Sequence, residues 1–109
     1  MVTGSTAEKQ ALNEAEIKLR LADLPQWKQE DKALIRVQTF PNYKDALEFV
    51  YKVGLAAEEN DHHPDIAMNF KRVTVRYWTH TARGITPLDF KMAGIVERLV
   101  EQHYHPVDK

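Results

Sequence analysis

Three of the five histidines in this 109-residue sequence lie near one another along the chain, and their spacing could support proton transfer. His62 and His63 are adjacent, and His80 follows after a segment whose pattern is typical of a β-hairpin. A neutral imidazole is the side chain best suited to moving protons near neutral pH. If the hairpin brings its two ends together, the three imidazoles form one cluster with acid–base capacity.

The segment between these histidines has the period-two pattern of two half-buried strands. Its larger apolar side chains alternate with smaller or polar ones, at Ile66, Met68 and Phe70 and again at Val73, Val75 and Tyr77. A turn centred on Phe70 and Lys71 predicts that Asn69 faces Arg72, that Pro64 faces Tyr77 and that Asp61 lies opposite His80. Directly opposed residues lie about 5 Å apart, so this register gathers the three histidines. The turn has no Asn-Gly or Asp-Gly pair, which leaves a one-residue slip open.

His80 is in phase with Trp78 and not with the valines of the second strand, so we expect it to be accessible. Trp78 on the same face is either a stacking wall for a flat ring or a cover for a subunit interface. Glu58 precedes His62 by one helical turn. It is either an ordinary exposed acid or a carboxylate that orients an imidazole and stabilises its charged form.

Other readings of these residues stay open. His62 and His63 also fit a helix-terminating loop with surface imidazoles. Three histidines suggest a zinc site, but two ligands would be immediate neighbours and the His-Glu-x-x-His spacing is absent, so we expect no metal. Asp89 fits the cap of a following helix better than direct chemistry, and His103 and His105 fall in a polar tail without an expected role.

The composition is that of an ordinary globular domain, with 43% hydrophobic and 28% charged residues. A net charge of −1 gives no basic field for nucleic acid or for a membrane surface. There is no cysteine, which excludes thiolate chemistry. No apolar run is long enough to span a bilayer, and Met1 to Thr6 lack signal-peptide features, so we expect a cytoplasmic protein.

The elements that must position the histidines follow the order α-β-β-α-β-β-α. Asn13 with Glu16 predicts a capping box for a first helix that ends by Pro25. Strands are expected at 27–30 and 33–40, a second helix from Asn42 to about Glu59, the hairpin, and a third helix starting at Thr86-Pro87. This order predicts an α+β fold with helices on one face of an antiparallel sheet. We expect one domain at 13–103, a frayed segment at 1–12 and a tail at 104–109.

The second helix is apolar on more than one side. Its first face carries Ala46, Phe49, Val50, Val53 and Ala57, and a second set widens the arc at Leu47, Tyr51, Gly54 and Leu55. A helix of this kind in so small a domain needs two covers, and we expect the sheet to supply one and another subunit the other.

The same residues resemble the pterin-4a-carbinolamine dehydratase family. The resemblance rests on Glu58-x-x-x-His62-His63-Pro64, an aromatic residue at Phe70, His80, and Asp89 after the loop. It extends to Trp27, to the helix at 40–57 and to Gly84-Ile85-Thr86, and covers about 13–100. It implies a four-stranded antiparallel sheet with three helices packed on one face, assembled as a homodimer or homotetramer.

By resemblance, the reaction is loss of water from 4a-hydroxytetrahydropterin to give quinonoid dihydropterin, which recycles the cofactor of aromatic amino acid hydroxylases. It requires no metal or organic cofactor. Both protonation of the leaving hydroxyl and removal of a ring-nitrogen proton suit imidazoles. His62 and His80 would do this acid–base work, with donor and acceptor unassigned. His63 would orient the pterin and Glu58 would tune an imidazole.

The resemblance also implies a substrate site lined by Asp61, Pro64, Trp78, Thr79 and Thr81 beside the histidines, with Asp89 as structural support. Trp78 and Thr81 depart from the residues often found beside His80, which could alter the pocket rim. Relatives of this fold also act as partner proteins, namely a dimerisation cofactor for a transcription factor and an assembly factor. A protein partner is therefore the alternative to catalysis, whereas neither direct nucleic-acid binding nor membrane binding is expected.

Overall fold

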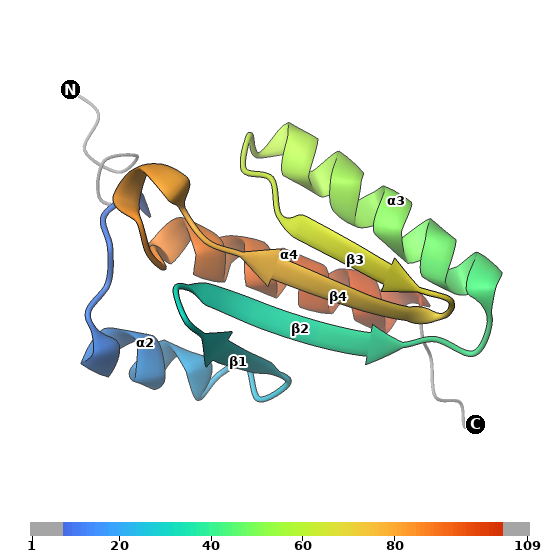
Figure 1. Cartoon of the computed structure of the whole chain (residues 1–109), viewed down its shortest axis with the longest axis horizontal. Helices are drawn as coiled ribbons and strands as arrows, with labels where there is room; N and C mark the ends of the chain where they lie inside the picture. Colours follow the sequence, from blue (N-terminus) through green and yellow to red (C-terminus); the bar gives the residue numbers. More distant parts are fainter. Residues whose placement is uncertain (1–7, 104–109) are drawn as a thin grey trace.

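The computed structural model describes residues 8–103. Its elements are α2 (Glu14–Leu21), β1 (Trp27–Glu30), β2 (Ala33–Thr39), α3 (Tyr43–Glu59), β3 (Asp65–Asn69), β4 (Arg72–Tyr77), the short 3₁₀ helix η1 (His80–Ala82) and α4 (Pro87–His103). The predicted α-β-β-α-β-β-α order is confirmed (Figure 1). The expected C-terminal tail with His105, and most of the expected frayed segment, fall on 104–109 and 1–7 and lie outside the described residues.

The four strands form one antiparallel sheet in the order β1-β2-β4-β3, with the helices packed on one face. The predicted hairpin register is correct, because Asn69 pairs with Arg72 and the ladder runs from there to Asp65 and Arg76. Phe70 takes a left-handed conformation with φ of 56° at the turn. The turn therefore closes without the glycine that usually marks such a position.

Side-chain caps begin the helices where the sequence predicts them. Asn13 and Glu16 form the complete capping box of α2, and the Asn42 side chain accepts a hydrogen bond from the backbone N–H of Asp45 at the start of α3. At α4, the Thr86 backbone N–H donates to Asp89 Oδ2 at 2.8 Å. Ordered structure also begins before α2, since the Leu12 N–H donates to the Ile85 carbonyl at 2.8 Å.

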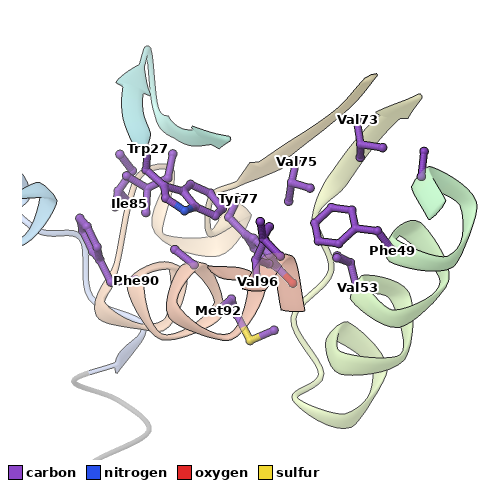
Figure 2. Packing of buried hydrophobic residues seen from close by; sticks show 14 of the residues in the cluster. Trp27, Phe49, Val53, Val73, Val75, Tyr77, Ile85, Phe90, Met92 and Val96 are labelled. Carbon is purple, nitrogen blue, oxygen red and sulfur yellow. The ribbon is translucent and has the colours of Figure 1, made fainter. Parts of the chain in front are cut away.

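The hydrophobic core lies between the sheet and helices α3 and α4 (Figure 2). Val73, Val75 and Tyr77 of β4 point into it and are at most 1% exposed. Phe49 of α3 lies beside them, Met92 of α4 belongs to the same cluster, and both are fully buried. This packing fixes the two helices relative to the end of β4, where the histidines lie.

A buried ion pair also attaches α4 to the sheet. Arg36 of β2 is only 5% exposed and lies directly opposite Val75, on the face covered by helices. Its guanidinium pairs with Glu97 of α4, and the indole N–H of Trp27 donates to the same carboxylate at 2.8 Å. The arginine side of β2 therefore faces the helices.

The outward face of α3 is apolar, as its sequence predicts. Exposed large side chains recur every four residues along it, at Tyr43, Leu47, Tyr51 and Leu55. Phe70 from the hairpin turn is 68% exposed and stacks on Tyr43, with ring centroids 6.2 Å apart. We call these five residues the α3 stripe.

None of the helices formed within residues 8–103 is long and apolar enough to cross a membrane.

Candidate active site

The end of α3 delivers the His62-His63 pair. Asn60 caps the helix, and Asp61 then turns the chain with a φ of 50°. Aspartate tolerates this left-handed conformation better than most residues with a Cβ. The His62 N–H still donates to the Ala57 carbonyl at 3.1 Å, which anchors the first histidine to the last turn of the helix.

The chain beyond β4 delivers His80. A β-bridge between Thr79 and Gly84 closes a small loop that contains η1, and Arg83 adopts the left-handed conformation within it. His80 at the start of η1 is exposed, as predicted from its phase. Its ring stacks on Trp78 with centroids 4.1 Å apart and planes 29° apart. Trp78 thus stacks on the histidine itself, and whether it also contacts a ligand or a second subunit stays a prediction.

These two segments enclose a pocket of about 350 Å³. It is lined by Lys9, Asp61, His62, His63, Trp78, Thr79, His80, Thr81 and Leu88. The sequence predicted ten catalytic, substrate-binding or supporting residues, and seven of them line this one pocket. Glu58, Pro64 and Asp89 are not among the lining residues, and Lys9 and Leu88 had no signal in the sequence that pointed to the site.

His62 is held by a buried carboxylate that the sequence places in the next helix. Its Nε2 lies 2.6 Å from Asp89 Oδ1, and the Asp89 side chain is fully buried. A carboxylate oxygen accepts, so the ring nitrogen donates. Asp89 caps α4 as expected, but that accounts for only one of its oxygens. The other oxygen contacts the candidate acid–base residue.

Tyr77 fixes His62 from a second side. The two rings stack with centroids 5.2 Å apart, and the Tyr77 hydroxyl donates to the His62 carbonyl at 2.9 Å. Burial, and secondarily the negative charge of Asp89, raise the pKa of Tyr77. The phenol therefore stays protonated and remains a donor at every physiological pH. Tyr77 was predicted only as a core residue, because its hydroxyl contact depends on the chain returning to it at His62.

Glu58 lies beside His63, not His62. Its Oε1 is 2.8 Å from His63 Nε2, and both side chains are largely exposed, Glu58 at 78% and His63 at 57%. The left-handed turn at Asp61 moves the histidines off the helical spacing on which the expectation was built. An exposed pair of this kind orients a ring but adds at most about 1 kcal/mol.

The arrangement provides two imidazoles in different environments within one pocket. His62 is mostly buried and fixed by a carboxylate, whereas His80 is exposed and fixed by an indole. Such a pair can donate a proton to one atom of a bound molecule and accept one from another. Within residues 8–103, no group of three or more His, Asp or Glu side chains is placed so that it could hold a metal ion.

The fold and the site define a class of protein, namely an α+β domain with a histidine-lined pocket at the open end of its β3-β4 hairpin. A family model described as "Pterin 4 alpha carbinolamine dehydratase" matches residues 10–99. The chain belongs to this family, which confirms the resemblance seen in the sequence.

Curated relatives cover most of the chain. One from Picosynechococcus sp. is 40% identical over 88 residues, which is 81% of this chain and 96% of the relative. Another from Sulfolobus acidocaldarius is 36% identical and covers 81% of this chain and 97% of the relative. Both carry the name "Putative pterin-4-alpha-carbinolamine dehydratase".

Solved structures share the fold. A crystal structure of a transcriptional coactivator/pterin dehydratase from Brucella melitensis aligns with a TM-score of 0.79 and 34% identity, and covers 83% of this chain and 98% of that one. A pterin dehydratase-like protein described as a RuBisCO assembly factor in the alpha-carboxysome aligns with a TM-score of 0.57 and 19% identity over 67% of this chain and 84% of its own. The second likeness concerns the fold alone.

Proposed function

We propose that this chain dehydrates 4a-hydroxytetrahydropterin to quinonoid dihydropterin and so recycles the pterin cofactor of aromatic amino acid hydroxylases in the cytoplasm. The observation that carries the proposal is the pairing of His62 with the buried carboxylate of Asp89, in a pocket that also holds His80. The cap of α4 accounts for one oxygen of Asp89 only, and the other oxygen is directed at His62. The family membership supports the choice of substrate.

In this reaction the C4a–O bond breaks and water leaves, while a ring nitrogen loses a proton and forms a double bond to C4a. One imidazole gives a proton to the leaving hydroxyl and the other accepts the nitrogen proton, so the protein ends with its protons redistributed. We assign these steps to His62 and His80. Such transfers contribute typically about 10²- to 10⁴-fold each.

The remaining lining residues would bind and orient the pterin. His63 is exposed at the pocket and its Nε2 donates to Glu58, so Nδ1 of the neutral ring can accept a hydrogen bond from a substituent of the pterin. Asp61, Thr81 and Trp78 lie around the same space. Pro64, which the family resemblance implies as a substrate contact, follows His63 in the chain but does not line the pocket. No metal or organic cofactor enters the proposal.

Stopped-flow absorbance of 4a-hydroxytetrahydropterin decay tests the function directly. The purified protein, treated with a chelator, should accelerate the decay. His62→Ala and His80→Ala should each remove most of the acceleration, and the double variant should lose far less than the product of the two effects, because the pair acts as a unit. A folded protein that gives no acceleration would reject the dehydratase. Acceleration lost with chelator and restored by zinc would reject the metal-free mechanism.

A second role as a partner-binding protein is favoured by one specific observation, the α3 stripe. Four side chains on one helix face and Phe70 beside them are exposed together. We propose that a second copy of this chain covers the stripe in a homodimer or homotetramer, and that a different protein partner is the alternative. The Brucella melitensis relative is itself described as a transcriptional coactivator, which fits that alternative. Light scattering at micromolar concentration decides, since a monomeric mass would reject self-association.

A further inference from the structure

The hydroxyl of Thr79 points into the protein and not at a bound molecule. Thr79 is 4% exposed, and its Oγ1 lies 2.9 Å from Asp89 Oδ2 and 2.8 Å from Thr86 Oγ1. Its backbone is fixed by the bridge to Gly84, where the Thr79 N–H donates at 2.9 Å. Thr79 therefore contributes its backbone to the pocket wall and its hydroxyl to the carboxylate behind His62.

The directions of these hydrogen bonds follow from counting protons. The Thr79 hydroxyl has one proton, and a carboxylate oxygen can only accept. Two hydroxyls approach Asp89 Oδ2, that of Thr79 at 2.9 Å and that of the fully buried Thr86 at 3.3 Å. The shorter contact favours Thr79 as the donor to Asp89, and the Thr86 hydroxyl proton is then directed at Thr79 Oγ1. The Thr86 backbone N–H also donates to Oδ2, at 2.8 Å. Two donors thus converge on one oxygen of Asp89.

This convergence fixes the rotation of the carboxylate. With Oδ2 held by Thr79 and Thr86, Oδ1 is directed at His62 Nε2. The proton of a neutral His62 is then on Nε2, and Nδ1 carries the free lone pair. Hydrogen bonds arranged in one direction strengthen one another, and here the direction runs from Thr86 through Thr79 to Asp89.

We propose that Thr79, supported by Thr86, is a positioning residue that sets the tautomer of His62 through Asp89, so that His62 exchanges protons with the substrate at Nδ1. The claim that His62 exchanges protons with the substrate rests on the dehydratase function proposed above. The claim about the tautomer of His62 does not, because it concerns the protein without substrate. It gives Thr79 a role different from the substrate contact that the family resemblance implies.

The tautomer is measured first in the native protein, by nitrogen-15 NMR of the imidazole rings. His62 is assigned by comparison with His62→Gln, and the spectra are recorded at a pH where the ring is neutral. We expect the protonated nitrogen to be Nε2. A ring protonated mainly on Nδ1 would overturn the inference, and this outcome does not depend on any Thr79 variant being folded.

The second measurement compares Thr79→Val, which keeps the shape but has no hydroxyl, with Thr79→Ser, which restores it. The valine variant should have a smaller fraction of the Nε2-protonated form, and its kcat should fall about tenfold with KM changed less than about twofold, the scale of one hydrogen bond to a charged group. Serine should restore both properties. Thr39→Val, an exposed threonine of β2, is the matched control and should change neither.

Two results would overturn the proposal at this stage. One is a folded Thr79→Val protein with native tautomer and native kcat, and the other is a loss of activity that Thr79→Ser fails to restore. If the tautomer responds as expected while even the native protein does not dehydrate the pterin, the positioning inference stands and the proposed function fails. The two proposals are therefore tested separately.

Discussion

Replacing Asp89 with asparagine tests the proposed site with the smallest change in shape. The native carboxylate accepts from the Thr86 N–H, from the Thr79 hydroxyl and from His62 Nε2. An asparagine keeps one accepting oxygen, and its best placement is toward Thr79 and Thr86, where two donors meet. Its NH₂ group then faces His62 Nε2. Two donors cannot share a hydrogen bond, so the proton of a neutral His62 must move to Nδ1.

The size of the effect follows from the interaction that is lost. A hydrogen bond to a charged group contributes about 1.5–3 kcal/mol. If Asp89 stabilises the protonated His62 that forms during the reaction, its loss lowers kcat by about ten- to hundredfold, at about 1.4 kcal/mol for each factor of ten. An Asp-to-Asn change behind the histidine of a serine protease triad costs about 10⁴-fold, because the wrong tautomer adds to the lost hydrogen bond. A loss above about a hundredfold here would indicate the same additional effect.

The assay is stopped-flow decay of 4a-hydroxytetrahydropterin, with urea unfolding measured in parallel. Asp45→Asn is the matched control, because Asp45 occupies the same capping position in α3 and contacts no histidine. It should lose at most about 1 kcal/mol of stability and retain native kcat. A folded Asp89→Asn protein whose kcat stays within about threefold of native would refute the role of the carboxylate.

Three further predictions concern other parts of the molecule. Trp78→Leu removes the stack on His80 and should lower kcat by about two- to tenfold, measured by the same assay, whereas unchanged kcat would mean that the indole does not position the ring. Burial, and secondarily the charge of Asp89, raise the pKa of Tyr77 in the folded protein above the value of 10.0 of an unfolded chain. The contribution of Tyr77 to stability is therefore complete below pH 10.0 and is lost as the pH rises above it. Urea unfolding above about pH 10 should therefore show a shallower loss for Tyr77→Phe than for native protein, and equal slopes would contradict this. Tyr51→Ser in the α3 stripe should lower the mass seen by light scattering without changing the unfolding midpoint of the monomer, and an unchanged mass would place the interface elsewhere.

Local signals were sufficient to predict the fold. The capping pairs of α2 and α4 and the Asn42 cap of α3 concern residues three apart, whose contacts form as soon as the first turn does. The hairpin register is the one predicted from a turn centred on Phe70 and Lys71, whereas the turn residues alone left a one-residue slip open. The burial of Arg36 does not follow from its own segment, because its partner Glu97 comes from α4, 61 positions further along the chain.

The candidate site was predicted as a set of residues but not as a set of contacts, and the difference has a physical cause. Hairpin closure brings His62 and His80 into one pocket, and the register predicts that from the sequence. The contact between His62 and Asp89 joins residues 27 positions apart and exists only because α4 packs on the sheet. A helix cap needs only one of the carboxylate's oxygens, so a capping aspartate at a helix start beside a pocket has one oxygen left for chemistry. Asp89 therefore caps α4 with one oxygen and contacts His62 with the other. Because the cap alone explains an aspartate at this position of the sequence, the contact with His62 could not be predicted from it.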